Sequence, residues 1–478
     1  MAKHILVVGA GLGGLATALR LAHRGHRVTV LEKTDQVGGR NRREWVEDCR
    51  FDGGPTLLMM LDPFEKLFRD VGEDFQKVLP ITLCDPSYRV FYSDGIQIDG
   101  TPNMARMLQE IERVSGPKDA RAYPEFIGRI AALYDASIPN FVRNNFQGLG
   151  SFASPRQLAR VLKHKMLSNL AKQVERTFDN ERLRMLFSFQ TMYLGLSPYD
   201  APWVYSTLAY MEYGQGIWYP KGGLPTISEA VAEHAVKRGA EIRLKSPVQS
   251  VNPTSVTLES GEVIKADAVV VNADLPYARK QLARKPPKKP WRNSCSAYVL
   301  YLKVRGDLPK LLHHNVFFGR DFKGNLDALF HSPRLVEDPA FYACVSKRSD
   351  ASAAPEGYMN LYLLIPCPNQ KFPFDEAQRQ HLRDQVFNRL DNEVGFDPED
   401  IVAEKSRDPN TWQSELNLHE GAAFGLSADT FQSAFMRPQN THDGVYYVGA
   451  STIPGNGLPM VLISAELVED RLRRAIDS

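Results

Sequence analysis

The stretch "HILVVGAGLGGLATALRLA", residues 4–22, decides the fold of this chain. An apolar run, "ILVV", comes first, a glycine-rich turn follows, and a segment rich in leucine and alanine comes last. This order predicts a buried strand, a tight turn and a helix. The next apolar run, "RVTVLE" at residues 27–32, predicts a second strand. Residues 4–33 are therefore expected to form a βαβ unit, which is typical of the α/β class.

The glycines of the turn have the spacing GxGxxG. Gly9 allows the chain to turn sharply off the strand, and Gly11 lets a pyrophosphate approach the backbone at the helix N-terminus. Gly14 lets the helix pack closely on the strand. Glu32 lies 18 residues after Gly14, where a carboxylate can accept hydrogen bonds from ribose hydroxyls. The unit is therefore predicted to bind a dinucleotide, and the alternative is a βαβ unit that binds nothing.

The segment after Glu32 indicates which dinucleotide binds. "KTDQVGGRNR", residues 33–42, supplies a flexible Gly-Gly backbone and a cation beside the same pyrophosphate. The glycine motif, the acid and "GGR" in register resemble the amine-oxidase-like flavoprotein superfamily, which binds FAD. The resemblance implies FAD as the cofactor, and "FDGGPTLL", residues 51–58, is then placed to approach the flavin. The cofactor-binding residues that it implies are Gly9, Gly11, Gly14, Glu32, Lys33, Gly39, Arg40, Gly54, Pro55, Val248, Gly449, Pro459 and Met460.

The end of the chain repeats the order strand, glycine-rich turn and helix. "GVYYVGASTIPGNGLPMVLISAELVEDRLRR" occupies residues 444–474. The resemblance implies that this segment closes the flavin site, with helix amides facing the edge of the ring that gains negative charge on reduction. Pro459 suits the first turn of that helix, where its missing N–H costs nothing.

The resemblance narrows to the bacterial-type carotenoid desaturases, which include phytoene and diapophytoene desaturases. "YYVGASTIPGNGLPMVLISA" (446–465), "GPTLLMM" (54–60) and "GIWYPKGGL" (216–224) carry it. It implies FAD-dependent introduction of conjugated double bonds into phytoene or a similar linear polyene, with a quinone or oxygen as electron acceptor. Ile453 departs from the family, where a polar residue is usual, and this leaves the substrate open. The alternatives are a diapophytoene (C30) desaturase, a polyene isomerase or saturase, and a non-catalytic carotenoid-binding flavoprotein.

The resemblance and the order of the predicted elements imply a discontinuous architecture. A Rossmann-like, two-dinucleotide-binding FAD domain is expected from residues 1–80, 219–275 and 426–478. An inserted α+β substrate-binding domain is expected from residues 81–218 and 276–425. Its helices are predicted over residues 103–190, and aromatic and β-branched runs at 296–304 and 359–365 predict strands.

A polyene has nothing to hydrogen-bond, so an apolar tunnel that ends at the flavin is expected. Two aromatic segments supply candidates for its wall, and the alternative for each is ordinary core. The candidates are Phe187, Phe189, Met192, Tyr193, Tyr205, Tyr210, Met211, Tyr213 and Trp218. Glu212, which lies among these aromatics, is the candidate acid/base group, although a paired structural carboxylate is the alternative. Flavin chemistry can also proceed without a side-chain base.

The composition places limits on partners and compartment. The formal net charge is +2, and no nucleic-acid partner is expected. The five cysteines are scattered and have no CxxC spacing, so neither a disulfide framework nor a metal site is expected. No run is long and apolar enough to span a bilayer. The chain is expected to be cytoplasmic and peripherally associated with the cell membrane; the sequence does not indicate an oligomeric state.

Residues 136–174 are the candidate membrane-associating helical region. The segment contains six Lys or Arg residues and no Asp or Glu. Within it, "PRQLARVLKHKMLSNLAKQV" (155–174) is predicted to be a helix with an apolar face beside basic residues, which is typical of a helix on an anionic membrane. The apolar face contains Leu158, Val161, Leu162, Met166, Leu167 and Leu170. The alternative is an amphipathic helix packed on its own domain.

Overall fold

The computed structural model describes residues 2–145, 154–287, 290–428, 432 and 444–476. Residues 146–153 of the candidate membrane-associating region lie outside these ranges. No helix in the described ranges is long and apolar enough to cross a membrane.

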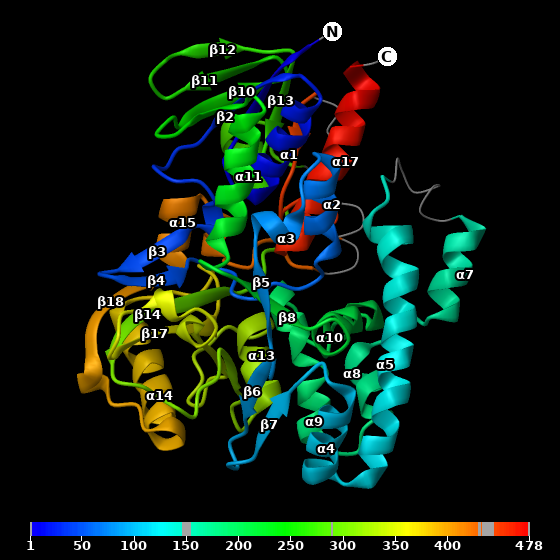
Figure 1. The fold of residues 1–478 in the computed structure, drawn as a ribbon, viewed down its shortest axis with the longest axis vertical. Coiled ribbons are helices and arrows are strands. Elements are labelled where there is room, and N and C mark those ends of the chain that lie inside the picture. The colour runs from blue at the N-terminus through cyan, green and yellow to red at the C-terminus, as the bar shows by residue number, and fades with distance from the viewer. Residues whose placement is uncertain (1, 146–153, 288–289, 429–431, 433–443, 477–478) are drawn as a thin grey trace.

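The glycine-rich turn at the start of the chain belongs to a five-stranded parallel sheet in the upper part of Figure 1. Its strand order is β19 (Tyr446–Tyr447), β13 (Ala268–Val271), β1 (His4–Val8), β2 (Arg27–Leu31) and β9 (Glu241–Arg243). The predicted βαβ unit is confirmed, with α1 (Leu12–His23) between β1 and β2. The strand predicted near the end of the chain joins the same sheet beside β13.

Both faces of this sheet are covered, and β1 is apolar on both sides from Ile5 to Val8. Ile5 and Val7 pack into a core formed with α1, α11 (Pro225–Lys237) and α17 (Leu458–Ile476). Leu6 and Val8 point to the opposite face, as the period of two in a strand requires. That face is covered by a three-stranded antiparallel sheet of β10 (Val248–Asn252), β11 (Ser255–Leu258) and β12 (Val263–Lys265).

A second, mixed sheet of seven strands lies below the first in Figure 1. Its order is β18 (Ile401–Arg407), β14 (Ser296–Arg305), β17 (Tyr358–Cys367), β16 (Phe341–Val345), β15 (His314–Phe317), β6 (Tyr88–Phe91) and β7 (Gln97–Gly100). The strands predicted at 296–304 and 359–365 are β14 and β17, which pair with each other inside this sheet. Helix α14 (Glu376–Val394) packs on one face through Leu382, Val386 and Leu390.

A helical region occupies the right side of Figure 1 and confirms the helices predicted over 103–190. Its elements are α4 (Met104–Ser115), α5 (Pro117–Ser137), the π-helix Ile138–Val142, α7 (Pro155–Lys163), α8 (Leu170–Glu175), α9 (Glu181–Leu186), the 3-10 helices Phe189–Leu194 and Trp203–Ser206, and α10 (Thr207–Tyr213). Smaller elements connect the three parts. They are β3 (Arg43–Val46), β4 (Cys49–Asp52), α2 (Asp62–Asp70), α3 (Phe75–Val78), β5 (Ile81–Cys84), β8 (Ile217–Pro220), α12 (Leu275–Tyr277), α13 (Phe322–Phe330) and α15 (Pro409–Leu416).

The prediction of a single helix over residues 155–174 is wrong. Helix α7 ends at Lys163, and α8 begins only at Leu170, where the Asn169 side chain caps it by accepting from the Lys172 N–H. The backbone between the two helices bonds elsewhere: the Trp203 N–H donates to the Ser168 carbonyl at 2.6 Å. These tertiary hydrogen bonds interrupt the helix that the apolar periodicity of the segment predicts. As a result, some of the apolar residues of the segment are buried and others are exposed.

Candidate active site

A cavity of about 1860 Å³ extends from the glycine-rich turn to the seven-stranded sheet and the helical region. Its wall includes residues of all three parts of the fold, and most of them are apolar. The cavity therefore joins a dinucleotide-sized end to an apolar end. Of the predicted cofactor residues, all but Gly14 line it; that they hold the cofactor stays a prediction.

The turn after β1 presents backbone to the cavity. Gly11 is the N-cap of α1, and no side chain caps this helix end, so the first-turn amides of α1 are left for a ligand. Gly9 has a φ of +99°, which only glycine adopts readily. Gly14 has the separate packing role that its position predicts, because a Cβ there would lie 2.2 Å from the Gly9 carbonyl oxygen. An uncapped helix N-terminus of this kind suits a pyrophosphate.

The acid after β2 is buried and held in one orientation. Glu32 is 7% exposed, and its Oε2 accepts the Ala10 N–H at 2.7 Å. Its Oε1 accepts from the N–H and the hydroxyl of Thr34, both at 2.9 Å. Lys33 also lines the cavity, and burial lowers the pKa of its ammonium although Glu32 opposes the shift. The carboxylate is fixed at the cavity wall, as recognition of a ribose diol requires.

The "GGR" segment runs directly beside the first glycine-rich turn, where the Gly38 N–H donates to the Ala10 carbonyl at 2.8 Å. The Arg40 side chain lines the cavity and donates to the Ala423 carbonyl at 3.3 Å. Burial lowers the pKa of the guanidinium, and Asp274 opposes this shift. Gly54 lies against it, since a Cβ there would be 2.5 Å from the Arg40 carbonyl oxygen. Pro55 lines the cavity beside it, so both predicted segments meet at one wall.

The C-terminal segment lines the same cavity, and that it closes a flavin site stays a prediction. The turn between β19 and α17 contributes Gly449, and the first turn of α17 contributes Pro459 and Met460. Val248, at the start of β10, lines the same cavity. The first and last glycine-rich turns therefore meet, although more than four hundred residues separate them in sequence.

Asn272 joins the two turns and was missed by the sequence analysis. Its side chain donates to the Gly9 carbonyl at 3.4 Å. A Cβ on Gly11 or on Gly449 would lie 2.7 Å from its amide group, so glycines from both ends of the chain make room for it. The available signal was the sequence "VVVNAD", in which a polar residue follows a buried strand at the carboxyl edge of a parallel sheet.

The apolar end contains only part of the predicted tunnel wall. Of the nine candidates, Phe189, Met192, Tyr193, Tyr205 and Met211 line the cavity. The other four pack elsewhere: Phe187 in the helical core, Tyr213 against it, Tyr210 against Tyr134, and Trp218 against the core of the five-stranded sheet.

The seven-stranded sheet and the region before α8 complete the wall. The additional residues include Val316, Phe341, Tyr342 and Leu364 from the sheet, Phe318 directly after β15, and Ile138, Phe141, Val161, Met166 and Leu167 from the region before α8. Strand patterns alone do not tell which face of a sheet meets a cavity, so the sequence analysis missed the first group. Leu167 is 64% exposed and also lines the cavity, so the wall reaches the molecular surface there.

Glu212 lies behind the cavity wall. It is fully buried, and its Oε2 accepts from the Tyr88 hydroxyl at 3.0 Å and from the Gln190 amide at 2.9 Å. Its Oε1 has no hydrogen-bond partner among the described residues. Burial raises the pKa of its carboxyl to about 7. Tyr193 lies beside the carboxylate and lines the cavity, so it connects Glu212 with the cavity. Its acid/base role stays a prediction.

Comparison with known proteins defines the class. The family described as flavin containing amine oxidoreductase matches residues 12–468. The chain belongs to this family. The fold agrees: cyclohexylamine oxidase from Brevibacterium oxydans superposes with a TM-score of 0.61 at 16% identity over 100% of both chains. Wild-type putrescine oxidase bound to putrescine gives 0.64 at 15% identity, also over 100% of both chains. The cofactor is therefore FAD.

Curated relatives narrow the class further. The chain is 43% identical to the zeta-carotene-forming phytoene desaturase of Myxococcus xanthus, over 98% of this chain and 94% of the relative. It is 33% identical to a phytoene desaturase of Phycomyces blakesleeanus, over 98% and 85%. It is 30% identical to the 4,4'-diaponeurosporene-forming diapophytoene desaturase of Staphylococcus haemolyticus, over 99% of both chains. All three relatives are carotenoid desaturases, which is the group that the sequence motifs resemble.

Proposed function

We propose that this chain is an FAD-dependent carotenoid desaturase that introduces conjugated double bonds into phytoene or a similar linear polyene. The observation that carries the proposal is the single cavity that joins a glycine-lined dinucleotide end to an apolar end. An apolar polyene is bound by burial, at roughly 25 cal/mol per Å² of apolar surface removed from water. The relatives named above support the same reaction.

The residues of the cavity would position the substrate and exclude water. When bound, FAD supplies a two-electron acceptor that takes a hydride from one allylic carbon while a proton leaves the neighbouring carbon. Phe189, Met192 and Tyr205 would hold the polyene rod against it, and this orientation is the main contribution of the protein. The electrons then pass to a quinone or to oxygen. Residues 81–218 and 276–425, which supply most of the apolar wall, would form the substrate-binding part.

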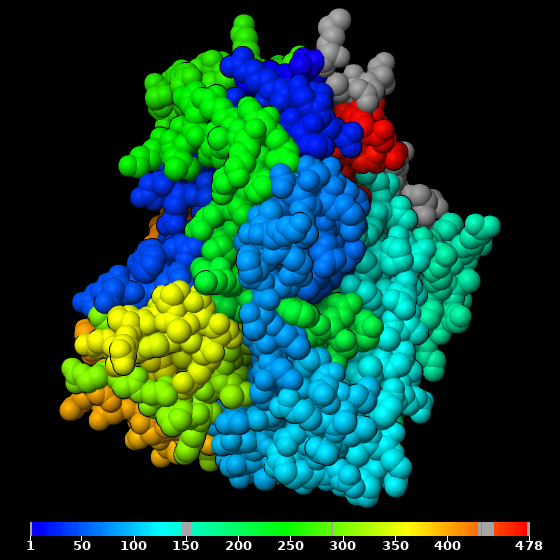
Figure 2. Space-filling view, viewed as in Figure 1, coloured from blue at the N-terminus to red at the C-terminus, as the bar shows by residue number. Residues whose placement is uncertain are grey.

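We further propose that α7 and the turn after it rest on an anionic membrane surface. Leu158, Leu162 and Leu167 are 55%, 68% and 64% exposed, which is unusual for three leucines within ten residues. Exposed basic residues lie beside them, among them Arg156, Lys163 and Lys165. Helix α7 lies at the outer margin of the molecule (Figure 2). Since Leu167 also lines the cavity, a polyene could pass from the bilayer into the site without crossing water.

Product analysis tests the reaction. The protein would be incubated without oxygen in liposomes that contain phytoene or diapophytoene, with FAD and a quinone. We expect red-shifted polyene absorption and a loss of two hydrogens per step by mass spectrometry. Reaction of diapophytoene alone would favour the C30 desaturase. A product of unchanged mass, or one that gains hydrogen, would favour the isomerase or the saturase. Both substrates unchanged with FAD bound would leave only a carotenoid-binding flavoprotein.

Vesicle flotation tests the membrane contact. Replacing Leu158 and Leu162 with serine removes two exposed apolar side chains, so we expect partitioning into phosphatidylglycerol vesicles to fall roughly tenfold or more. Val236→Ser is the matched control, because Val236 is 52% exposed on α11, away from the basic segment. Equal partitioning of the two variants would contradict the assigned surface.

A further inference from the structure

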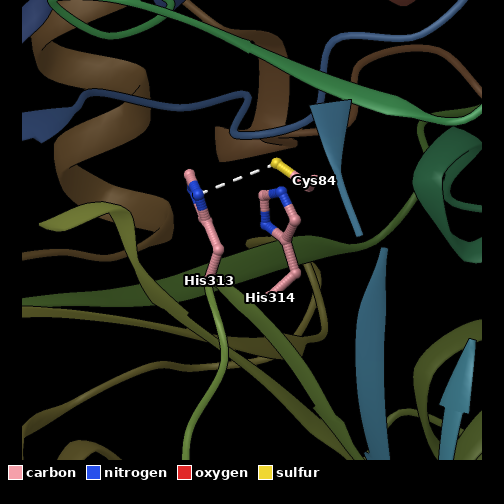
Figure 3. Close-up of side chains that lie close together, drawn as sticks. All are labelled: Cys84, His313 and His314. Atoms are coloured by element: carbon pink, nitrogen blue, oxygen red, sulfur yellow. Dashed lines mark hydrogen bonds between the residues drawn. The ribbon is translucent and has the colours of Figure 1, made fainter. Parts of the chain in front are cut away.

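The fold brings one cysteine and two histidines together outside the cavity (Figure 3). Cys84 ends β5, His314 begins β15, and His313 immediately precedes that strand. One potential ligand atom from each residue lies within 4.8 Å of the other two. All three are buried, with exposures of 4%, 5% and 0% for Cys84, His313 and His314. They form a compact group of sulfur and nitrogen donors shielded from solvent.

Each imidazole has one nitrogen that is hydrogen-bonded and one that is not. His313 Nδ1 lies 2.6 Å from the Ser349 hydroxyl, and His314 Nδ1 lies 2.6 Å from the Tyr342 hydroxyl. In contrast, Nε2 of each ring has no hydrogen-bond partner among the described residues. Buried polar atoms are rarely left in this state, because an unsatisfied group costs about 1–3 kcal/mol. Histidines that bind metals show the same division, with one nitrogen on the metal and the other in a hydrogen bond.

The three donors suit a metal ion in kind. A divalent cation at this position would displace the thiol proton of Cys84 to solvent and bind the resulting thiolate.

We propose that Cys84, His313 and His314 bind a Zn²⁺ ion. One thiolate and two imidazoles are the ligand types that zinc takes, and its tetrahedral geometry leaves a fourth position for water. Zn–S bonds of about 2.3 Å and Zn–N bonds of about 2.0–2.1 Å would bring the ligand atoms roughly 3.5 Å apart. The potential ligand atoms already lie within 4.8 Å of one another, so a small rearrangement of side chains would close the site.

At this position the ion would connect β5 with β15. Cys84 packs in the core of the five-stranded sheet, whereas His314 belongs to the seven-stranded sheet and pairs with Cys344. An ion bound to both would link the two sheets. It would also fix His314, whose Nδ1 holds the Tyr342 hydroxyl at the cavity wall. This proposal does not depend on the carotenoid reaction, and its test uses no activity.

Metal analysis of the purified full-length flavoprotein tests the site. We expect about one zinc per chain after dialysis against a weak chelator, and X-ray absorption at the zinc edge should show one sulfur neighbour at about 2.3 Å. Cys84→Ser and His313→Gln should each lower the zinc content on the order of tenfold. Cys49→Ser is the matched control, because Cys49 is also buried but packs in a different cluster, with Val46 and Phe51.

Several results would overturn the proposal. One is a wild-type protein that contains almost no zinc and takes up none when Zn²⁺ is added. Another is bound zinc with only oxygen and nitrogen neighbours. A third is equal zinc loss in Cys84→Ser and Cys49→Ser. The absorption measurement on the wild type decides the question even if the variants fail to fold.

Discussion

The two ends of the cavity recognise their ligands by different means. The dinucleotide end presents backbone, and its glycines leave no room for a Cβ next to Asn272 and the Gly9 carbonyl. The apolar end presents side chains that come from the helical region and from the seven-stranded sheet. Backbone recognition tolerates almost no substitution at the contact, whereas an apolar wall tolerates a change of shape when volume is kept. Sequence motifs therefore mark the first end clearly and the second end poorly.

The largest expected loss of stability comes from adding a side chain where α1 packs against β1. In Gly14→Ala the new Cβ would lie 2.2 Å from the Gly9 carbonyl oxygen, which is backbone and cannot turn aside. We expect the free energy of unfolding to fall by about 3 kcal/mol or more, with loss of bound flavin. Thermal melts and flavin absorbance measure both. Gly128→Ala in α5 is the matched control, since its Cβ meets nothing within 4 Å and alanine should stabilise that helix by about 0.5–1 kcal/mol. Equal losses in both variants would contradict the packing argument.

The second-largest effect is expected at Glu212, which lies behind the apolar end of the cavity, and it is a change of stability with pH. Burial raises the pKa of the Glu212 carboxyl to about 7, so the folded state favours the protonated form. Its contribution to stability is then fully present below the unfolded pKa of about 4.3 and is lost as the pH rises through about 7. Glu212→Gln cannot ionise, so its stability relative to wild type should rise between about pH 4 and pH 7, by on the order of 3 kcal/mol, and stay constant above that range. Melting curves across this range measure the difference, and parallel pH profiles would show that Glu212 does not titrate there.

A smaller loss is expected at the ribose end. Glu32→Gln keeps the shape of the side chain but removes the charge that strengthens its hydrogen bonds, so we expect FAD to bind roughly tenfold more weakly. Flavin retained after gel filtration measures this. Glu241→Gln is the control, because Glu241 is exposed on β9 of the same sheet. Unchanged flavin content in Glu32→Gln would contradict the role assigned to the acid.

The smallest effect is expected in the apolar wall. Met192→Leu conserves volume and apolar character at a residue that lines the cavity, so stability should change by less than about 1.5 kcal/mol and flavin should be retained. The apparent affinity for the polyene is measured from the rate of product formation at increasing polyene concentrations. A loss of stability or of bound flavin as large as that in Gly14→Ala would contradict the difference proposed between the two ends of the cavity.

Particular residues show how far sequence reasoning reached. The βαβ unit, the "GGR" segment and the closing strand and helix were predictable because short-range patterns specify them. The break after Lys163 was not, because the backbone at Ser168 bonds to Trp203, which no local pattern indicates. Asn272 and Tyr342 were missed because their roles come from tertiary contacts. Asn272 contacts both glycine-rich turns, and Tyr342 lines the cavity.

The sequence by itself determined the class of fold, the flavin cofactor and the family, because glycine spacing and strand periodicity act over a few residues. Only the tertiary structure decided which aromatic residues line the cavity, that Glu212 lies behind Tyr193, and that Cys84 meets His313 and His314. The scattered cysteines gave no sign of a metal site in the sequence. Such groupings depend on contacts between residues far apart in the chain, and packing of the whole molecule sets those contacts.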